Sequence, residues 1–368
     1  MRRARRRSVN THSRREFLRA AAVAGVAASG LSSLALGCGR PAKIRVGQIG
    51  TRHLHAAGKM DAMRASDDFD VVGIVEPDPH LRAAAEASRS YAGLAWLTEE
   101  QLLRTDGVRA VAVETEIRDL VPTAARCIAA GKHVHLDKPP GESLPAFRRL
   151  LEEATRRGLT VQMGYMLRYN PAFQLCFRLA REGYLGEVFA IDATMSKAVD
   201  AAVRRRLLPY RGGSMFEIGC HVIDAVVTVL GRPSKVTAHN RSSSPLNDAF
   251  ADNCLAVLEY PRASVTVRSA IIDVEGEARR QFTVSGTKGT FDIRPLEPPH
   301  ARLSLDAPHG DYDAGDHEVT LPPMRGRYEG EFEDLARVIR GQKTLEFSPE
   351  HDLNVQETVL LASGLPVE

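Results

Sequence analysis

The sequence predicts an α/β protein in which a doubly wound parallel sheet precedes an α+β part with a predominantly antiparallel, open-faced sheet. Between residues 43 and 163, short apolar strands alternate with helical segments, and this alternation is typical of a parallel sheet. From residue 164, longer strands with alternating apolar side chains follow one another with few helices between them, which favours an antiparallel sheet with one covered face. The 368 residues, 43% of them hydrophobic, are enough for two domains, which we expect at 43–163 and 164–368.

Residues 1–40 are expected to be a targeting leader outside the fold. Eight arginines lie within residues 1–19, so the formal net charge of +3 belongs to the leader, and no nucleic-acid partner is predicted. The segment Ser13–Arg19 matches a twin-arginine export signal, whereas the apolar run Ala20–Leu36 is too short and too rich in small residues to predict a membrane span. We therefore expect a protein that is exported by the twin-arginine pathway and is periplasmic or anchored facing the periplasm.

Cys38 stands near the end of this leader, after Ala35-Leu36-Gly37. This order is an imperfect lipobox, and cleavage before Cys38 would leave a lipid-modified cysteine that anchors the protein. Cleavage nearby would instead release a soluble product, and both alternatives stay open. The remaining cysteines form no CxxC pair and are expected to be free buried thiols: Cys127, Cys176, Cys220 and Cys254.

The first domain has a degraded glycine loop after its first strand. A dinucleotide fingerprint would place glycine at 50, 52 and 55, where this chain has Gly50, Arg52 and His55. Gly50 can still make the tight turn, and the charge of Arg52 can meet a pyrophosphate. Strands are expected at 43–50, 70–76, 108–113 and 133–137, with helical segments around 61–64, 81–86 and 121–130.

Two side chains at strand ends are candidates for ligand contacts, because ligands bind beyond the carboxyl ends of parallel strands. Glu76 ends the second strand, and an acid there can accept hydrogen bonds from a ribose diol and repel a 2′-phosphate, which favours NAD while leaving NADP possible. Lys138 precedes Pro139, so its backbone is extended, and it can hold a substrate hydroxyl or a cofactor ribose. The alternatives are an exposed glutamate and a solvated turn lysine.

The second domain is expected to contain a helix at 171–181 and strands at 188–194, 235–239, 253–260, 263–272, 281–285 and 289–293. Residues 296–316 are rich in proline, aspartate and glycine and predict a surface loop. Helices at 328–340 and 351–363 close the chain.

The stretch 212–230 predicts one helix of about four to five turns that carries Glu217, His221 and Asp224 at i, i+4 and i+7, on one face. A carboxylate four residues before a histidine can fix its tautomer and raise its basicity. Gly219 within the helix suggests that something flat approaches the backbone. Three alternatives remain: a capping box from Ser214 and Glu217, a histidine satisfied in the core, and a metal-binding face. We predict no metal site.

The order of these parts resembles the Gfo/Idh/MocA family of glucose-fructose oxidoreductases and inositol dehydrogenases, over about residues 43–363. The resemblance rests on Gly47–Gly50, Asp137-Lys138-Pro139, Gly164–Asn170, Gly212–Asp224 and Phe282–Thr290, together with the Tyr328–Glu333 segment. It implies a Rossmann domain followed by an open-faced domain that binds substrate and often forms homo-oligomers. Departures from the family pattern occur at positions 52, 55 and 137, and at Glu114-Thr115-Glu116, which replaces a Thr-Pro turn.

The resemblance further implies that Lys138, Glu217 and His221 are catalytic in an NAD(P)-dependent oxidoreductase for a small sugar or polyol. His221 would take the hydroxyl proton, Glu217 would orient its ring, and Lys138 would stabilise the developing negative oxygen. Tyr165, Arg168, Lys197 and Asp224 are weaker candidates for substrate binding, and Arg204–Arg206 could meet an acidic sugar or form a solvated loop. Two other hypotheses are a glycosidase that oxidises its sugar transiently and a non-catalytic sugar-binding or partner protein.

Overall fold

The structure is a computed structural model that describes residues 41–246 and 248–368. The leader 1–40, with Cys38 and the twin-arginine segment, lies outside the described residues. Ala42–Glu368 form one compact unit. In this described part, no helix combines the length and the apolar character needed to cross a membrane. The four cysteines within it are free and buried, as predicted.

The first sheet is parallel and has the strand order β2-β1-β3-β4-β5. Its strands are β1 (Ile44–Ile49), β2 (Phe69–Val75), β3 (Val108–Val113), β4 (His133–Leu136) and β5 (Val161–Met163). The helices of this half are α1 (Ala56–Ala65), α2 (Pro79–Glu86), α3 (Glu99–Arg104), α4 (Ile117–Ala129) and α5 (Leu144–Arg156), with a 3₁₀ turn at Arg89–Tyr91. The doubly wound parallel sheet is therefore confirmed, although α5 and the three-residue β5 were not expected.

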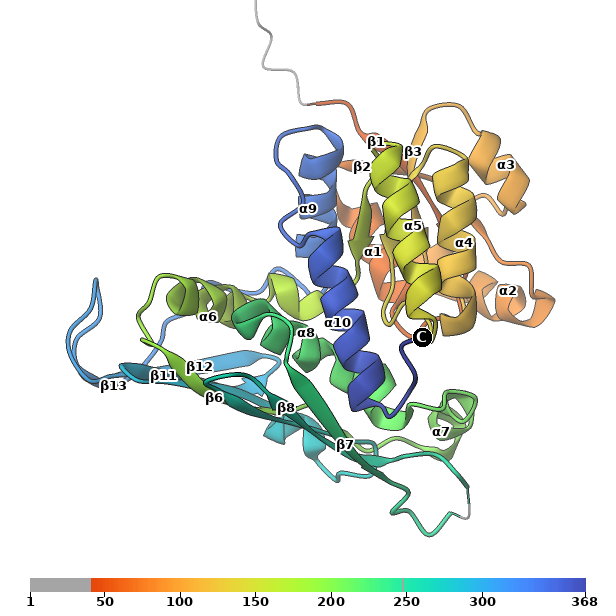
Figure 1. Cartoon of the computed structure of the whole chain (residues 1–368). Helices are drawn as coiled ribbons and strands as arrows, with labels where there is room; N and C mark the ends of the chain where they lie inside the picture. The colour runs from red at the N-terminus through yellow and green to blue at the C-terminus, as the bar shows by residue number, and fades with distance from the viewer. Residues whose placement is uncertain (1–40, 247) are drawn as a thin grey trace, which may run out of the picture. The chain divides into compact units, whose positions relative to one another are not determined.

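Side chains of the first sheet alternate between two apolar layers. The helices that carry these layers surround the strands β1 to β3 in Figure 1. Val111 and Val113 of β3 pack in the layer of α4 and α5, whereas Ala110 and Ala112 pack in the layer of α1. This alternation follows from the period of two in a strand. A sheet buried on both faces leaves its strand ends as the places where polar groups can meet a ligand.

The second sheet is predominantly antiparallel, with the order β13-β12-β11-β10-β6-β9-β8-β7 and one parallel pair, β6 with β9. Its strands are β6 (Val188–Thr194), β7 (Lys235–Arg241), β8 (Asn253–Glu259), β9 (Ser264–Ala270), β10 (Gln281–Gly286), β11 (Gly289–Leu296), β12 (Pro299–Leu305) and β13 (Gly315–Glu318). Helices α6 (Pro171–Arg181) and α8 (Cys220–Leu230) lie on one side of it (Figure 1). The expected open-faced sheet is confirmed, with 3₁₀ turns at Met166–Tyr169 and Gly276–Arg279.

Two predictions about irregular segments are wrong. Residues 296–316 do not form a simple surface loop, because β12 and the start of β13 lie there and pair antiparallel to one another. Ala301 and Leu303 are buried on the covered face, so alternation outweighs the turn-rich composition. The stretch with Arg204–Arg206 is the helix α7 (Ala201–Leu207), which begins where the Asp200 carboxylate accepts hydrogen bonds from the backbone of Ala202 and Val203.

The last two helices return to the earlier parts of the chain. Phe332 and Leu335 of α9 (Glu329–Ile339) pack in the α1 layer of the first sheet, and the Phe332 ring lies 5.8 Å from that of Phe69. The backbone carbonyl of Glu331 accepts a hydrogen bond from Gln162 in β5. Helix α10 (Pro349–Ala362) contacts α5 and α8. A helix more than 150 residues downstream in the sequence thus completes the cover of the first sheet.

Candidate active site

A cavity of about 370 Å³ lies where the end of β4 meets the start of α8 and the segment after β6. Its lining is rich in charged and ring side chains: His55, Lys138, Lys197, Asp200, Glu217, His221, Glu277, Arg280, Arg327 and Tyr328. The sequence-predicted Lys138, Lys197, Glu217 and His221 are therefore brought together in one cavity. Such a lining can hold a ligand that carries several hydroxyl groups.

The Lys138 ammonium is fixed by the backbone and side chain of Glu217. Its Nζ lies 2.6 Å from the Glu217 carbonyl oxygen and 3.4 Å from Oε1. Burial opposes the charged form of Lys138, but nearby Glu217 and other negative groups outweigh it and raise the pKa of the ammonium. Burial likewise opposes ionisation of Glu217, but the positive charges of Lys138 and Lys197 outweigh burial and lower the pKa of this carboxyl to about 2. The pair is therefore ionised at neutral pH.

His221 lies beside this pair, and no carboxylate within residues 41–246 and 248–368 forms an ion pair with it. Its Nδ1 is buried and makes no hydrogen bond with any described residue, and its ring lies 5.9 Å from that of His55. Burial lowers the pKa of His221, and Lys138 and His55 lower it further, so the imidazole is neutral. The expectation that Glu217 orients His221 is not met: no hydrogen bond joins them, because the Glu217 carboxylate is directed to Lys138.

The start of the helix explains why the expected geometry differs. Met215–Gly219 form a π turn before α8, so the run 214–230 is not one regular helix. The Ser214 hydroxyl donates to the Ser269 carbonyl, and no side-chain cap bond is present, so the capping box is absent. A Cβ on Gly219 would stand 2.6 Å from the Met215 sulfur, so packing by Met215, within the same π turn, accounts for this glycine.

Arg168, Asp224 and Tyr165 do not line the cavity. Arg168 Nη2 lies 2.7 Å from Asp224 Oδ1 and 2.6 Å from Asp352 Oδ1, and all three side chains are almost fully buried. The Tyr165 ring packs between the Arg168 guanidinium, 5.0 Å away, and His221, 6.1 Å away. The geometry gives Arg168 and Asp224 a place in a buried ion cluster below the cavity rather than a direct contact with a ligand.

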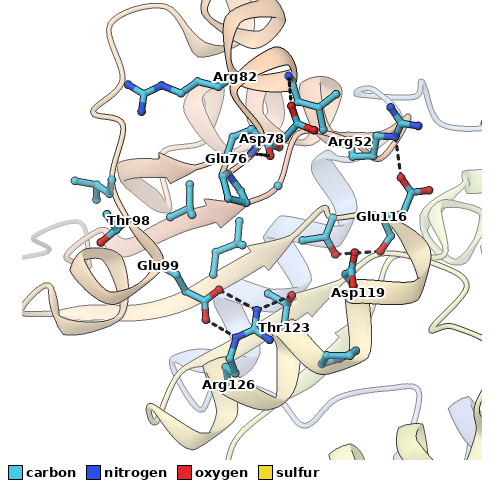
Figure 2. A pocket seen from close by; sticks show the side chains of 18 of the residues that line it. Arg52, Glu76, Asp78, Arg82, Thr98, Glu99, Glu116, Asp119, Thr123 and Arg126 are labelled. Atoms are coloured by element: carbon cyan, nitrogen blue, oxygen red, sulfur yellow. Dashed lines mark hydrogen bonds and ion pairs between the residues drawn. The ribbon is translucent and has the colours of Figure 1, made fainter.

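A second and larger cavity, of about 780 Å³, lies at the carboxyl ends of β1, β2 and β3 (Figure 2). Glu76 lines it after β2, where one carboxylate oxygen accepts hydrogen bonds of 2.8 Å from the Thr51 backbone and hydroxyl. Arg52 also lines it and pairs with Glu116 at 2.8 Å. Gly50 has a φ of 93°, and a Cβ there would stand 2.7 Å from the Glu114 backbone, so the turn requires glycine.

Comparisons with known proteins identify the family. Residues 44–165 match the model of an oxidoreductase family with an NAD-binding Rossmann fold, and residues 173–292 match the model of the Gfo/Idh/MocA C-terminal domain. The chain belongs to the Gfo/Idh/MocA family. It is an NAD(P)-dependent oxidoreductase of that type.

Relatives within the Gfo/Idh/MocA family are distant. The chain is 26% identical over 271 residues to an uncharacterized oxidoreductase of Rhizobium meliloti. This match covers 72% of this chain and 79% of the relative. It is 25% identical over 249 residues to trans-1,2-dihydrobenzene-1,2-diol dehydrogenase of Sus scrofa, and this match covers 64% of this chain and 73% of the relative. In fold it is similar to the aldose-aldose oxidoreductase of Caulobacter crescentus, with a TM-score of 0.74, 19% identity and coverage of 88% and 98%.

The residues of the larger cavity fit the adenosine half of the nicotinamide dinucleotide that the Gfo/Idh/MocA family implies. The Glu76 carboxylate stands at the end of β2, where it can accept hydrogen bonds from a ribose diol. Arg52 belongs to the loop after β1, lines this cavity and can meet a diphosphate. Between the two cavities, only about 30 Å³ remains, beside α7, and Arg206 donates to the Arg52 carbonyl at 2.7 Å. The helix α7 and the glycine loop are therefore in direct contact between the two cavities.

Sequence reasoning missed a cluster beneath the first cavity. His53 and His55 both lie against Asp137, with Nδ1 to carboxylate-oxygen distances of 2.9 and 3.2 Å. Lys59 approaches the same carboxylate at 3.0 Å and is fully buried. The signal that could have found this cluster is the His-x-His spacing in a loop that faces the end of β4.

Proposed function

We propose that this oxidoreductase is exported by the twin-arginine pathway and transfers a hydride between a carbinol of a sugar or polyol and NAD. The observation that carries the substrate class is the convergence of Lys138, Lys197, Glu217 and His221 on one cavity. A polyhydroxylated ligand can satisfy several such groups, whereas an apolar ligand would leave them without hydrogen bonds.

Neutral His221 is the group suited to accept the hydroxyl proton of the reacting carbinol, since its lowered pKa leaves the imidazole unprotonated. The Lys138 ammonium is suited to stabilise the oxygen as it becomes negative. Glu217 supports this role by holding Lys138 charged and in place, not by orienting His221. When bound, the nicotinamide supplies the hydride chemistry.

The relatives agree with an alcohol substrate. The substrate named for the Sus scrofa relative is a vicinal diol, and sugars and polyols also present neighbouring secondary hydroxyls. For the cofactor, the Glu76 carboxylate would repel a 2′-phosphate, which supports NAD over NADP. The contact of α7 with the glycine loop, in which Arg206 donates to the Arg52 carbonyl, supports slow exchange of the nucleotide, because a dinucleotide that extends between the two cavities would lie against this helix.

Export of the protein and slow exchange of its bound nucleotide support one another. Free nicotinamide nucleotide is scarce outside the cytoplasm, so we infer that the nucleotide is loaded before export and then reduced and reoxidised in place. Retention through dialysis corresponds to a dissociation constant of about 1 µM or tighter, worth roughly 8 kcal/mol. The reoxidant would be a second carbonyl compound, or the same sugar later in one turnover.

The deciding experiment begins with the exported protein. We would dialyse it, denature it and assay the released nucleotide, then supply polyols and aldoses to the native protein and follow the bound nucleotide by absorbance. We expect NAD to be retained and to be reduced by a sugar or polyol. A released monosaccharide without net NADH would instead support the glycosidase hypothesis, and an empty protein that binds no added NAD at millimolar concentration would refute the proposed oxidoreductase cycle.

The state of the leader needs its own measurement. We propose Cys38 as the lipid-bearing residue of a membrane-anchored form. Mass spectrometry of the mature amino terminus would give a diacylated Cys38 if this is correct. A mature protein that begins elsewhere and stays in the soluble periplasmic fraction would refute the anchor without affecting the catalytic proposal.

A further inference from the structure

The cluster of His53, His55 and Asp137 has the composition and placement of a metal site. The two histidines come from the degraded glycine loop and the aspartate from the end of β4, and one ligand atom from each lies within 4.8 Å of the others. The carboxylate is fully buried and the histidine side chains are only 4% and 12% exposed. Two imidazoles and one carboxylate are ligands that bind divalent transition metals.

The orientation of His53 independently points to a cation. Its Nε2 lies 3.0 Å from the Lys138 carbonyl oxygen, and because a carbonyl only accepts, Nε2 carries the proton. The lone pair on Nδ1 of a neutral ring then faces Asp137 Oδ2 at 2.9 Å, an arrangement of two acceptors. A proton or a metal ion must lie between them. Metal-bound histidines usually donate their second nitrogen to a carbonyl or carboxylate in this way.

The distances match those of a coordination sphere. Ligand atoms about 2.0–2.1 Å from a metal, at angles near 90° to 110°, stand about 2.9–3.4 Å apart. His53 Nδ1 lies 2.9 Å from Asp137 Oδ2, and His55 Nδ1 lies 3.2 Å from Asp137 Oδ1. One ligand atom from each of the three residues lies within 4.8 Å of the others, so the longest separation must shorten when the three side chains share one ion.

The surrounding charge also favours a cation. One buried ammonium, Lys59, faces three buried carboxylates, Glu114, Asp137 and Glu331, at 3.5, 3.0 and 3.7 Å. If all three carboxyl groups were ionised beside neutral histidines, two negative charges would be uncompensated in a region that excludes water; burial and the nearby Asp137 raise the pKa of Glu114, which reflects this excess of negative charge. Neither oxygen of Glu114 accepts a hydrogen bond from a described residue. A divalent ion would neutralise the cluster, as would two protons.

We propose that His53, His55 and Asp137 bind one divalent transition-metal ion, of which Zn²⁺ is the representative. His55 lines the same cavity as Lys138 and His221, so the ion lies at its wall. With three protein ligands, it would keep at least one position open, and a substrate oxygen can occupy that position. This inference does not depend on the identity of the sugar or on nucleotide binding.

The test uses tag-free protein purified without chelators, with metal content measured by inductively coupled plasma mass spectrometry. We expect about one transition-metal ion per chain, or the same after Zn²⁺ is added to chelator-treated protein and excess is removed. Substitution with Co²⁺ should give a visible ligand-field spectrum. His55→Gln should weaken Zn²⁺ binding by at least about 100-fold, and His53→Gln should do the same.

His80→Gln is the matched control, because His80 lies on the exposed helix α2 and its removal should leave metal content unchanged. If His53→Gln does not fold, His55→Gln and the Co²⁺ spectrum of the wild type still decide the question. Less than about 0.1 ion per chain after reloading with Zn²⁺, Mn²⁺ and Fe²⁺ would overturn the proposal, and protons would then balance the cluster. Equal metal content in His55→Gln and wild type would overturn it too. Metal content is read without substrate, so it is independent of the oxidoreductase assay.

Discussion

Replacing Asp224 by asparagine separates a stabilising role from a substrate-binding role. The Arg168 guanidinium donates to both Asp224 oxygens, at 2.7 and 3.1 Å, and to Asp352 at 2.6 Å. His351 Nε2 lies 3.3 Å from Asp224 Oδ1. Asparagine keeps the shape of the side chain and removes its charge, so the buried guanidinium loses the carboxylate with which it makes the most hydrogen bonds.

The expected loss is about 3–5 kcal/mol, the cost of breaking a buried ion pair by neutralising one partner. Against a total stability of about 5–15 kcal/mol, this is a large fraction. Asp352→Asn should cost less. Burial opposes ionisation of both carboxyls, but Arg168 and His351 outweigh it at Asp224 and lower its pKa, whereas at Asp352 burial prevails and raises the pKa.

Urea unfolding followed by far-ultraviolet circular dichroism measures these differences, together with KM for the identified substrate. Glu86→Gln is the control, since it breaks an exposed pair with Arg82 and should change the free energy of unfolding by less than about 0.5 kcal/mol. If Asp224→Asn were as stable as the wild type but had a strongly raised KM, the stabilising role would be refuted and direct substrate binding supported.

Three further outcomes follow from the same contacts. His221→Ala should lower kcat by roughly two to four orders of magnitude with nucleotide binding unchanged, measured by steady-state kinetics and calorimetry; equal losses of stability and activity would indicate a core histidine. Glu76→Ser should relax the preference for NAD, and a wild type that binds NADP more tightly would contradict the position assigned to Glu76. The pKa of Asp352 is raised in the folded protein, so the folded wild type binds this proton more tightly than the unfolded chain does. As pH rises above about 4, the wild type loses the stability that this proton contributes, whereas Asp352→Asn has no such proton to lose and should gain stability relative to the wild type. Unfolding curves at several pH values would show parallel changes if this is wrong.

The regular elements could be predicted from the sequence because each carries a local signal. Strand alternation located most of both sheets, and the end of β4 placed Lys138 at the ligand edge. The strands β12 and β13 were missed because proline, aspartate and glycine are frequent in the segment 296–316 around them. Their pairing, of β12 with β11 and of β13 with β12, depends on neighbouring strands and not on a local pattern. The π turn at Met215–Gly219 was missed because its apolar pattern also fits a regular helix, whereas the folded turn packs against β9, where Ser269 lies.

The candidate site was predictable only in part. Lys138, Lys197, Glu217 and His221 do converge, but spacing on an assumed regular helix assigned Glu217 the wrong neighbour. The sequence makes Arg168 and Asp224 weaker candidates for substrate binding, whereas in the structure they pair with each other, and Asp352, far along the chain, also pairs with the buried guanidinium. His55 was counted as a lost glycine. Only the folded loop brings it and His53 to Asp137.

The return of α9 to the first sheet has a consequence for synthesis on the ribosome. The apolar layer that holds Met60 and Met63 of α1 and Phe69 of β2 is complete only when Phe332 and Leu335 of α9 have been made. Until then, this side of the amino-terminal half stays open to water and to chaperones that bind apolar surface. A fragment that stops near residue 165 should therefore aggregate, and the nascent chain should complete its first sheet only after translation is almost finished.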